Sequence, residues 1–262
     1  MTVDFTEEIK QDLESDDWTV HHAAEMDSTN EWAKRLAEEG APDLTVCLAD
    51  EQTAGKGRLG RVWKSPAGTS VSMSVLLRPS VRPEHLSMLT LVMGMAAADG
   101  LGKIMGLPVG IKWPNDVVIN GKKLCGILTE TASDGSWVVI GIGINVNMTD
   151  FPEELRSKAS SIRLETGREE SLPRTAAVVL NEFRDYYRAF LETEDMSGLR
   201  ATYERMLVNI HEKVRVLDPG GAFNGTALGI DDAGDLLVRR DDGTVVHVYS
   251  GEVSVRGIYG YT

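Results

Sequence analysis

Cysteine is scarce in this chain. Its 262 residues include two cysteines, Cys47 and Cys125, and both lie inside apolar stretches. Two separate cysteines form neither a disulfide framework nor a zinc-binding spacing, and they suit the reducing cytosol, so we expect a cytoplasmic protein. No apolar run approaches the ~20 residues of a membrane-spanning helix. Residues 1–17 are acidic and lack the apolar core of a secretory signal, so we expect no membrane association.

Acidic residues are missing from one stretch of an otherwise acidic chain. The formal net charge is −13, and residues 1–51, with 15 acids and 3 bases, carry −12 of it. Residues 52–83 contain no acid. The six bases of this stretch are Lys56, Arg58, Arg61, Lys64, Arg78 and Arg82. A local basic island indicates an anion-binding site, whereas a duplex-binding surface needs an extended basic face. The acidic N-terminal segment would repel DNA, so we predict no DNA binding.

Apolar periodicity predicts both strands and helices. Serine alternates with apolar residues across 70–79, which predicts a strand with one face in the core, and the helical spacing across 84–105 predicts a buried helix. Ser28 followed by Glu31 predicts a capping box at the start of a helix. Residues 172–208 are typical of two helices. The apolar stripe of these helices is expected to contain Leu180, Phe183, Tyr187 and Leu191.

Turn residues organise the rest of the chain. Asn120-Gly121 and Asp134-Gly135 lie between apolar runs and predict tight hairpin turns, because both turn positions need positive φ. The last fifty residues read as short, evenly spaced strands, which is typical of a small β-barrel. We therefore predict an α/β domain over residues 1–210, with a mixed, largely antiparallel sheet flanked by helices. Residues 211–262 are predicted to form the barrel.

The glycine loop GKGRLG (55–60) fits the pattern G-x-G-x-x-G. A dinucleotide-binding turn must open a helix and be followed about 20 residues later by an acid, whereas this loop leads to a strand and no acid is nearby. A Walker A motif also fails, since Gly57 follows Lys56. What remains is either a solvated surface turn or a bent loop whose basic side chains converge on one anion.

Two further stretches favour the second interpretation. In KWPND (112–116) and the following GKK, a hairpin at Asn120-Gly121 can place Asp116 and Lys123 on adjacent strands. A carboxylate beside a lysine can hold a metal-bound phosphate, although a plain cross-strand ion pair is the alternative. GIGINVN (141–147) interrupts a strand with two glycines, which indicates either close approach to a ligand or packing at a sheet bend.

Taken together and in this order, these stretches resemble the biotin protein ligase family. The resemblance covers most of the chain. It comprises DSTN (27–30), EQTAGKGRLGRVWKSPAG (51–68), SVLLRP (74–79), KWPNDVVINGKKLCGIL (112–128) and GIGINVN (141–147). It implies a class II synthetase-like catalytic domain and a C-terminal SH3-like β-barrel. Some members carry an N-terminal DNA-binding domain, but DSTN begins here at residue 27, so we expect a ligase without repressor activity.

The resemblance also implies a two-step reaction. Biotin and MgATP would give biotinyl-5'-AMP and pyrophosphate, and a lysine of a biotin carboxyl carrier domain, from a carboxylase or decarboxylase, would then take the biotin. The alternatives are a lipoate–protein ligase and a non-catalytic biotin- or nucleotide-sensing module. The family often dimerises, so a homodimer is possible.

Individual residues are carried over from the family on the motifs quoted above. Those expected to bind biotin are Ser28, Thr29, Asn30, Gln52, Gly55, Lys56, Gly57, Arg58, Lys123 and Gly126. Those expected to bind ATP are Arg58, Arg61, Trp63, Lys112, Asn115, Asp116, Lys123 and Asn145. The catalytic residues would be Lys123, Arg58 and Asp116, with Asp116 either binding Mg²⁺ or deprotonating the incoming lysine. Either Lys56 or Lys112 would be the main partner of the biotin carboxylate.

The glycine loop departs from the family at one position. The family loop usually reads GRGRxGR, and Lys56 stands here in place of the first arginine. Lysine keeps the positive charge but loses the bidentate fork of the guanidinium.

Overall fold

The computed structural model describes residues 5–61, 63, 65–218, 220–250 and 254–257. Its larger sheet has seven strands in the order β1-β2-β3-β7-β6-β5-β4. β1 and β2 pair in parallel, and all other neighbours pair antiparallel. The prediction of a mixed, largely antiparallel sheet is confirmed. The strands are β1 (Thr19–Met26), β2 (Thr45–Gln52), β3 (Ser70–Leu77), β4 (Gly110–Lys112), β5 (Asp116–Ile119), β6 (Lys122–Thr131) and β7 (Val138–Asn145).

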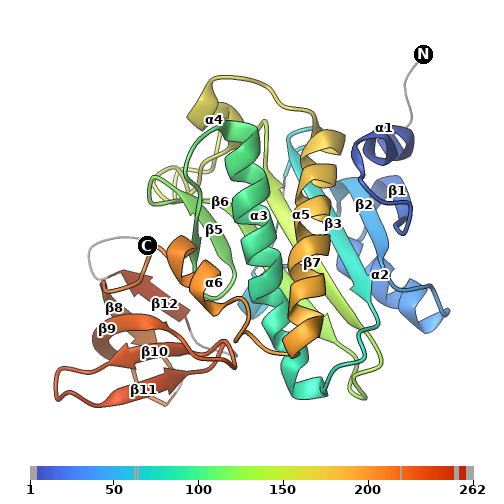
Figure 1. Ribbon diagram of the computed structural model, residues 1–262. Coiled ribbons are helices and arrows are strands. Elements are labelled where there is room, and N and C mark those ends of the chain that lie inside the picture. The colour runs from blue at the N-terminus through green and yellow to red at the C-terminus, as the bar shows by residue number, and fades with distance from the viewer. Residues whose placement is uncertain (1–4, 62, 64, 219, 251–253, 258–262) are drawn as a thin grey trace.

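Helices cover both faces of this sheet. α3 (Leu89–Met105) and α5 (Leu172–Thr193) lie side by side across one face (Figure 1), and their buried residues form the main core with the strands below. α2 (Thr29–Glu38) packs on the opposite face, against β2, β3 and β7. The remaining helical segments are α1 (Phe5–Asp12), η1 (Arg58–Gly60), η2 (Pro83–Met88), α4 (Ile162–Thr166) and α6 (Arg200–Met206).

The buried helix predicted over 84–105 is confirmed as η2 followed by α3. By length and composition, Pro83–Met105 could cross a membrane, with a hydropathy of 1.3 over its most apolar window. However, 72% of that window is buried inside the protein, as in the core helix of a globular domain. The high apolar content is therefore explained by packing against the sheet and α5.

The strand predicted over 70–79 is confirmed as β3, and its serine face is buried as well as its apolar face. Val71, Met73 and Val75 join the main core, while Ser72 and Ser74 are buried on the side of α2. Ser72 and Ser74 are buried because α2 folds over them, and Thr29 and Asn30 of this helix are hydrogen-bond partners of the Ser74 hydroxyl.

Local predictions succeed only in part. Asn120 and Gly121 have φ of 49° and 73°, which confirms their tight turn, but at the second hairpin only Gly135 has a positive φ. That hairpin closes over a longer loop, in which the Ala132 amide donates to the Trp137 carbonyl at 3.0 Å. In the predicted apolar stripe of α5, Leu191 is 38% exposed and Phe190 is buried in its place.

The C-terminal strands form a second, five-stranded sheet. Its order is β11-β10-β9-β8-β12, with antiparallel pairing throughout. The strands are β8 (Lys213–Leu217), β9 (Phe223–Ile230), β10 (Leu236–Arg239), β11 (Val245–Val248) and β12 (Ser254–Gly257). Trp113, between β4 and β5, donates from Nε1 to the carbonyl of Gly234, in the turn between β9 and β10, at 3.0 Å. The boundary near residue 210 stays a prediction.

Candidate functional site

A pocket lies on the α2 side of the larger sheet, with an empty volume of about 480 Å³ that includes open solvent. It brings together the start of α2, the glycine loop, the β4–β5 turn and the centres of β6 and β7. The predicted site residues that line it are Ser28, Thr29, Asn30, Gln52, Lys56, Gly57, Arg58, Trp63, Asn115, Lys123 and Gly126. Segments more than a hundred residues apart in sequence therefore share one cavity.

The uncharged end of the pocket is a network of hydrogen-bonded side chains. Gln52 Oε1 accepts from the Thr29 amide at 2.8 Å, and Ser74 Oγ lies 2.8 Å from Thr29 Oγ1 and 2.6 Å from Asn30 Oδ1. Asn30 Nδ2 donates to Glu130 Oε2 at 2.8 Å and to the Leu128 carbonyl at 3.2 Å. Thr29 and Asn30 are buried. Their polar atoms are thus held in fixed directions before any ligand binds.

The capping box predicted at Ser28 and Glu31 is wrong. Ser28 occupies the N-cap position of α2, but its hydroxyl makes no capping hydrogen bond. Gln52, from the end of β2, satisfies the Thr29 amide instead, and the Glu31 carboxylate bonds to Lys34 and Lys56. A side chain distant in sequence thus replaces the local cap. Ser28 does not cap the helix and lines the pocket.

The position of Lys123 depends on an irregularity in the pairing of β5 and β6. Val118 pairs with Lys123 and Val117 pairs with Cys125, so the register skips Leu124. Because side chains alternate between the faces of a strand, an unbroken register would place Lys123 on the face opposite Gly126. The skipped residue brings Lys123 to the pocket side.

Lys123 and Asp116 meet there as an ion pair, which confirms that they lie on adjacent strands. Their side chains are 26% and 14% exposed. Gly126 pairs with Asp116, and a Cβ at Gly126 would lie 2.6 Å from Lys123 Nζ. Gly126 must therefore be glycine if the ammonium is to occupy this place.

Close side-chain contacts also explain why β7 carries glycine at two positions. A Cβ at Gly141 would overlap the Asn30 side chain, and a Cβ at Gly143 would lie 2.7 Å from the Trp63 indole. In GIGINVN the two glycines thus allow close packing of the Asn30 and Trp63 side chains, and close approach to a ligand stays a prediction. Sequence reasoning missed the apolar part of the lining. It consists of Met73, Ile127, Leu128 and Ile142. Met73, Ile127 and Ile142 also belong to the main core, so their apolar character in the sequence does not distinguish them from other core positions.

The glycine loop folds back on itself beside the pocket. The Gly57 amide donates to the Arg61 carbonyl at 2.7 Å, and the Trp63 amide donates to the Gly55 carbonyl at 2.9 Å. Arg58 reaches across to donate to Asn115 Oδ1 and to the Ser250 carbonyl, both at 2.7 Å. The pKa of the Arg58 guanidinium is lowered, mainly because the group is buried. Arg58 therefore ties the loop to both sheets.

Five predicted site residues lie outside the lining of the pocket. Gly55 is buried in the base of the loop, where a Cβ would meet the Trp63 carbonyl, and Arg61 is exposed on the loop. Asn145 is buried and donates from Nδ2 to the Ser160 carbonyl at 3.0 Å. Lys112 is buried and stands opposite Asp116 in the β4–β5 register. Asp116 stays close to the pocket through its contact with Lys123.

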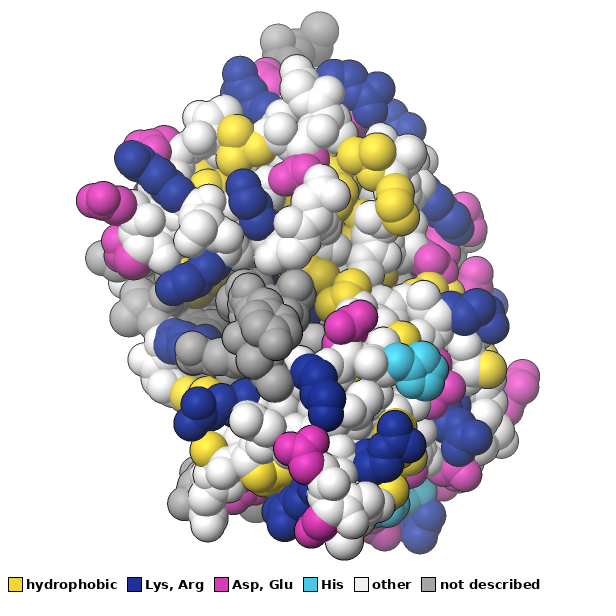
Figure 2. Space-filling model, turned by 90° about the vertical axis from the view of Figure 1, so that its left-hand side faces the viewer, with side chains coloured by type: hydrophobic (Ala, Val, Ile, Leu, Met, Phe, Trp, Pro, Cys, Tyr) yellow, Lys and Arg dark blue, Asp and Glu magenta, His cyan; other side chains and the backbone are white. Residues whose placement is uncertain are grey.

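The charged side chains that line the pocket have one sign, although carboxylates lie behind two of them. The charged side chains in its lining are Lys56, Arg58 and Lys123, all cationic. On the side of the molecule drawn in Figure 2, by contrast, basic and acidic side chains are mixed and form no continuous basic face. The basic island predicted from the sequence thus has a local meaning: part of it borders one cavity that suits an anion.

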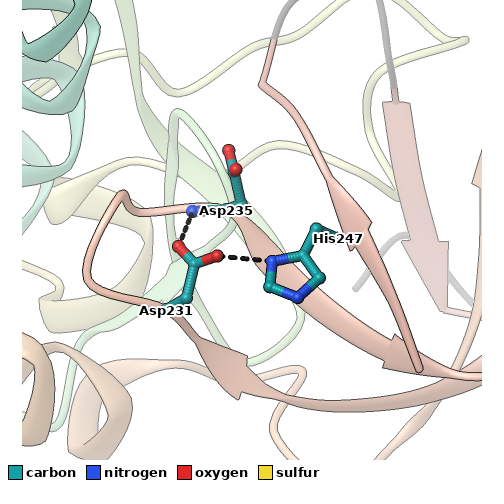
Figure 3. Close-up of side chains that lie close together, drawn as sticks. All are labelled: Asp231, Asp235 and His247. Atoms are coloured by element: carbon teal, nitrogen blue, oxygen red, sulfur yellow. Dashed lines mark hydrogen bonds and ion pairs between the residues drawn. The ribbon is translucent and has the colours of Figure 1, made fainter.

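A separate group of potential metal ligands lies in the C-terminal sheet. Within the described residues, Asp231, Asp235 and His247 are the one group of at least three His, Cys, Asp or Glu whose ligand atoms all lie within 4.8 Å of one another. Asp231 Oδ2 contacts His247 Nδ1 at 2.6 Å, and Asp231 Oδ1 accepts from the Asp235 amide at 3.0 Å (Figure 3). Burial, together with the Asp231 charge, raises the pKa of Asp235 to about 6.

Comparison with known proteins identifies the family. Residues 23–147 match the biotin/lipoate A/B protein ligase family, and residues 210–256 match the biotin protein ligase C terminal domain. The bifunctional ligase/repressor BirA of Bacillus subtilis is 38% identical over 237 residues, which are 88% of this chain and 72% of that protein. The chain belongs to the biotin protein ligase family.

Other members are similar over nearly their full length. The biotin–[acetyl-CoA-carboxylase] ligase of Mycobacterium tuberculosis is 35% identical, and the alignment covers 88% of this chain and 86% of that one. The structure of the Aquifex aeolicus biotin protein ligase in complex with biotin and ATP is 32% identical, with a TM-score of 0.81 and coverage of 91% and 99%. The family resemblance and the fold class are thereby confirmed. The cytoplasmic location, the absence of DNA and membrane binding, and the possible homodimer stay predictions.

Proposed function

We propose that this protein activates biotin with ATP, giving biotinyl-5'-AMP and pyrophosphate, and then transfers the biotin to a lysine of a carrier domain. The observation that carries the proposal is the polarity of the pocket. One end presents uncharged polar groups and apolar side chains, and the charged side chains of the lining are all cations. Biotin has the matching polarity, with a neutral ureido ring at one end and a carboxylate at the other.

The uncharged end suits the biotin rings. Thr29, Asn30 and Gln52 offer fixed donors and acceptors for the ureido group, while Leu128, which pairs with Gly141 on the pocket face of the sheet, offers apolar contact for the sulfur ring and chain. Glycines at 126, 141 and 143 leave room beside the backbone for the side chains of Lys123, Asn30 and Trp63, which line the pocket. Small ligands are commonly held this way, by an apolar wall with a few placed polar groups.

The cationic end suits the first chemical step. A biotin carboxylate oxygen attacks the α-phosphorus of ATP, a new P–O bond forms, and the bond to pyrophosphate breaks. Both reactants are anions and repel each other, so the reaction needs fixed positive charge where they meet. Lys123 supplies it next to Gly126, and Arg58 and Lys56 supply it from the loop. Lys123 would stabilise the charge that develops on the pentavalent phosphorus.

The nucleotide would lie between the loop and the β4–β5 turn. Trp63 lies against Gly143 and lines the pocket, where its indole is available for contact with the adenine ring. Asn115 is held by its donation from Nδ2 to the Ile127 carbonyl at 3.0 Å and by its contact with Arg58. Arg61, Lys112 and Asn145 lie outside the lining, and we assign them to the more distant phosphates or to the support of the loop and strands.

Magnesium ion fits this site as a companion of ATP. Mg²⁺ binds proteins through one or two carboxylates and completes its coordination with water and substrate phosphates. Asp116 is the carboxylate in contact with Lys123 at the cationic end, and it would hold the ion, which neutralises phosphate charge when bound. Asp116 could instead take the proton of the carrier lysine in the second step.

The second step forms an amide. The carrier lysine nitrogen attacks the biotinyl carbonyl, the bond to AMP breaks, and the lysine loses a proton. The relatives from Mycobacterium tuberculosis and Paracoccus denitrificans are named as ligases of acetyl-CoA carboxylase. A carboxylase carrier domain is therefore the partner that we propose.

An exchange experiment tests the function. The purified protein should incorporate labelled pyrophosphate into ATP when biotin is present, and lipoate should not replace biotin. Exchange with lipoate instead of biotin would favour a lipoate–protein ligase. Biotin binding without exchange would favour a sensing module. The absence of both biotin binding and exchange would refute the proposal.

A further inference from the structure

The glycine loop is attached to helix α2 by one ion pair. Lys56, in the loop, donates from Nζ to Glu31 Oε1 at 2.7 Å. Glu31 lies in the first turn of α2, two residues after Thr29. This is a long-range contact, since 25 residues separate the partners in sequence. It joins the loop to the element that carries the uncharged end of the pocket.

Glu31 is itself held in place from the side of the sheet. Lys34 Nζ donates to Glu31 Oε1 at 2.8 Å and to Glu130 Oε1 at 2.9 Å. The other oxygen of Glu130 accepts from Asn30, which lines the pocket. The two lysines and two glutamates thus form a chain of alternating charge that runs from the loop to the pocket wall.

This chain differs from an ordinary surface ion pair. The side chains of Glu31, Lys34 and Glu130 are 29%, 21% and 31% exposed, whereas that of Lys56 is 55% exposed. A fixed acid therefore faces a cation on a loop. The hydrogen bond from Lys34 is the largest cause of the lowered pKa of Glu31, and the hydrogen bond from Lys56 is the next largest. If Lys56 leaves, the Glu31 charge is still compensated by Lys34, so the loop can detach without leaving a buried, unpaired carboxylate.

We propose that Glu31 is a positioning residue that holds the glycine loop against the pocket through Lys56 and thereby slows the escape of a bound adenylate. Lys56 attaches the loop to Glu31 on the α2 side, and Arg58 attaches the loop to Asn115 and Ser250 on the other side. Loss of one attachment raises the fraction of time that the loop is detached. The part concerning the adenylate rests on the proposed function.

Limited proteolysis of the full chain without ligand tests the attachment. An arginine-specific protease should cut after Arg58 and Arg61 when the loop opens, and it ignores Lys56. Where opening is fast relative to cleavage, the rate follows the population of the open loop. Partly exposed ion pairs contribute up to about 1 kcal/mol, so Glu31→Gln and Lys56→Gln should each raise the cleavage rate about two- to fivefold.

The double variant and a matched control decide whether the effect passes through this pair. Glu31→Gln combined with Lys56→Gln should be cut no faster than either single variant, because the same contact is lost once. Glu38→Gln changes an exposed acid of the same helix and should behave as the unchanged protein. Cleavage of Glu31→Gln at the unchanged rate, or effects that multiply in the double variant, would overturn the proposal.

A second measurement links the loop to the adenylate. Biotinyl-5'-AMP should dissociate from Glu31→Gln about two- to fivefold faster than from the unchanged protein, with the thermal midpoint preserved. Faster loop cleavage with an unchanged dissociation rate would refute the role in retention. If the unchanged protein forms no adenylate, the proposed function fails, while the proteolysis result still decides whether Glu31 holds the loop.

Discussion

Removal of the Lys123 ammonium is the sharpest test of how the pocket works. Lys123→Ala deletes a cation that the β6 register irregularity brings to the pocket side, next to Gly126 and in contact with Asp116. The biotin rings would lie elsewhere, against Thr29, Asn30 and the apolar lining. The variant should therefore impair adenylation far more than it impairs biotin binding.

The size of the effect follows from the charges. Two unit charges ~4 Å apart attract by about 4 kcal/mol at an effective dielectric constant of ~20, which corresponds to nearly 10³-fold in rate. Asp116 already accepts a hydrogen bond from the ammonium, so part of this attraction is balanced. We expect kcat for pyrophosphate exchange to fall about 10²-fold, near the lower limit for loss of one preorganised group at a developing charge.

The assay compares exchange kinetics with biotin affinity measured by calorimetry. Lys122→Ala is the matched control, because Lys122 neighbours Lys123 in β6 but does not line the pocket. Equal thermal midpoints would establish that the folds are intact. The reasoning fails if Lys123→Ala retains kcat within about threefold, or if its biotin affinity falls as much as its turnover.

Three further predictions concern the loop, the sheet and the C-terminal turn. Arg58→Gly removes the bonds to Asn115 and Ser250, so the adenylate should escape and biotinylate a bystander protein on avidin blots; labelling confined to the carrier would contradict this. Gly143→Ala should displace the Trp63 indole and raise the KM for ATP about tenfold, as for loss of one stacking contact, with biotin affinity unchanged. A larger loss for biotin than for ATP would place the nucleotide elsewhere. Asp235 has a folded pKa of about 6, above its usual 3.8, so its ionisation destabilises the fold as pH rises through that window. Asp235→Asn should therefore raise the free energy of unfolding on the order of 1 kcal/mol at pH 7.5, after allowance for solvent screening. It should have little effect at pH 4, and an equal gain at both pH values would exclude this cause.

The chain's own residues determined much of its architecture. Apolar spacing located the buried helix before β4, and the two left-handed turn residues Asn120 and Gly121 located the β5–β6 hairpin. These features are local, because backbone φ preferences and helical periodicity act over a few residues. The family motifs also predicted eleven of the residues that line the pocket, since their order along the chain is specific even where each piece alone is not.

Tertiary structure decided the features that depend on distant partners. The serines of β3 are buried because α2 covers them, and Gln52 rather than Ser28 satisfies the first turn of that helix. The face on which Lys123 lies depends on one skipped residue in the pairing with β5, which no periodicity reveals. Lys56, which the family motif predicts to bind biotin, forms an ion pair with Glu31. Hydrogen bonds and charge pairs act at contact distance whatever the separation in sequence, so only the folded chain determines which of them form.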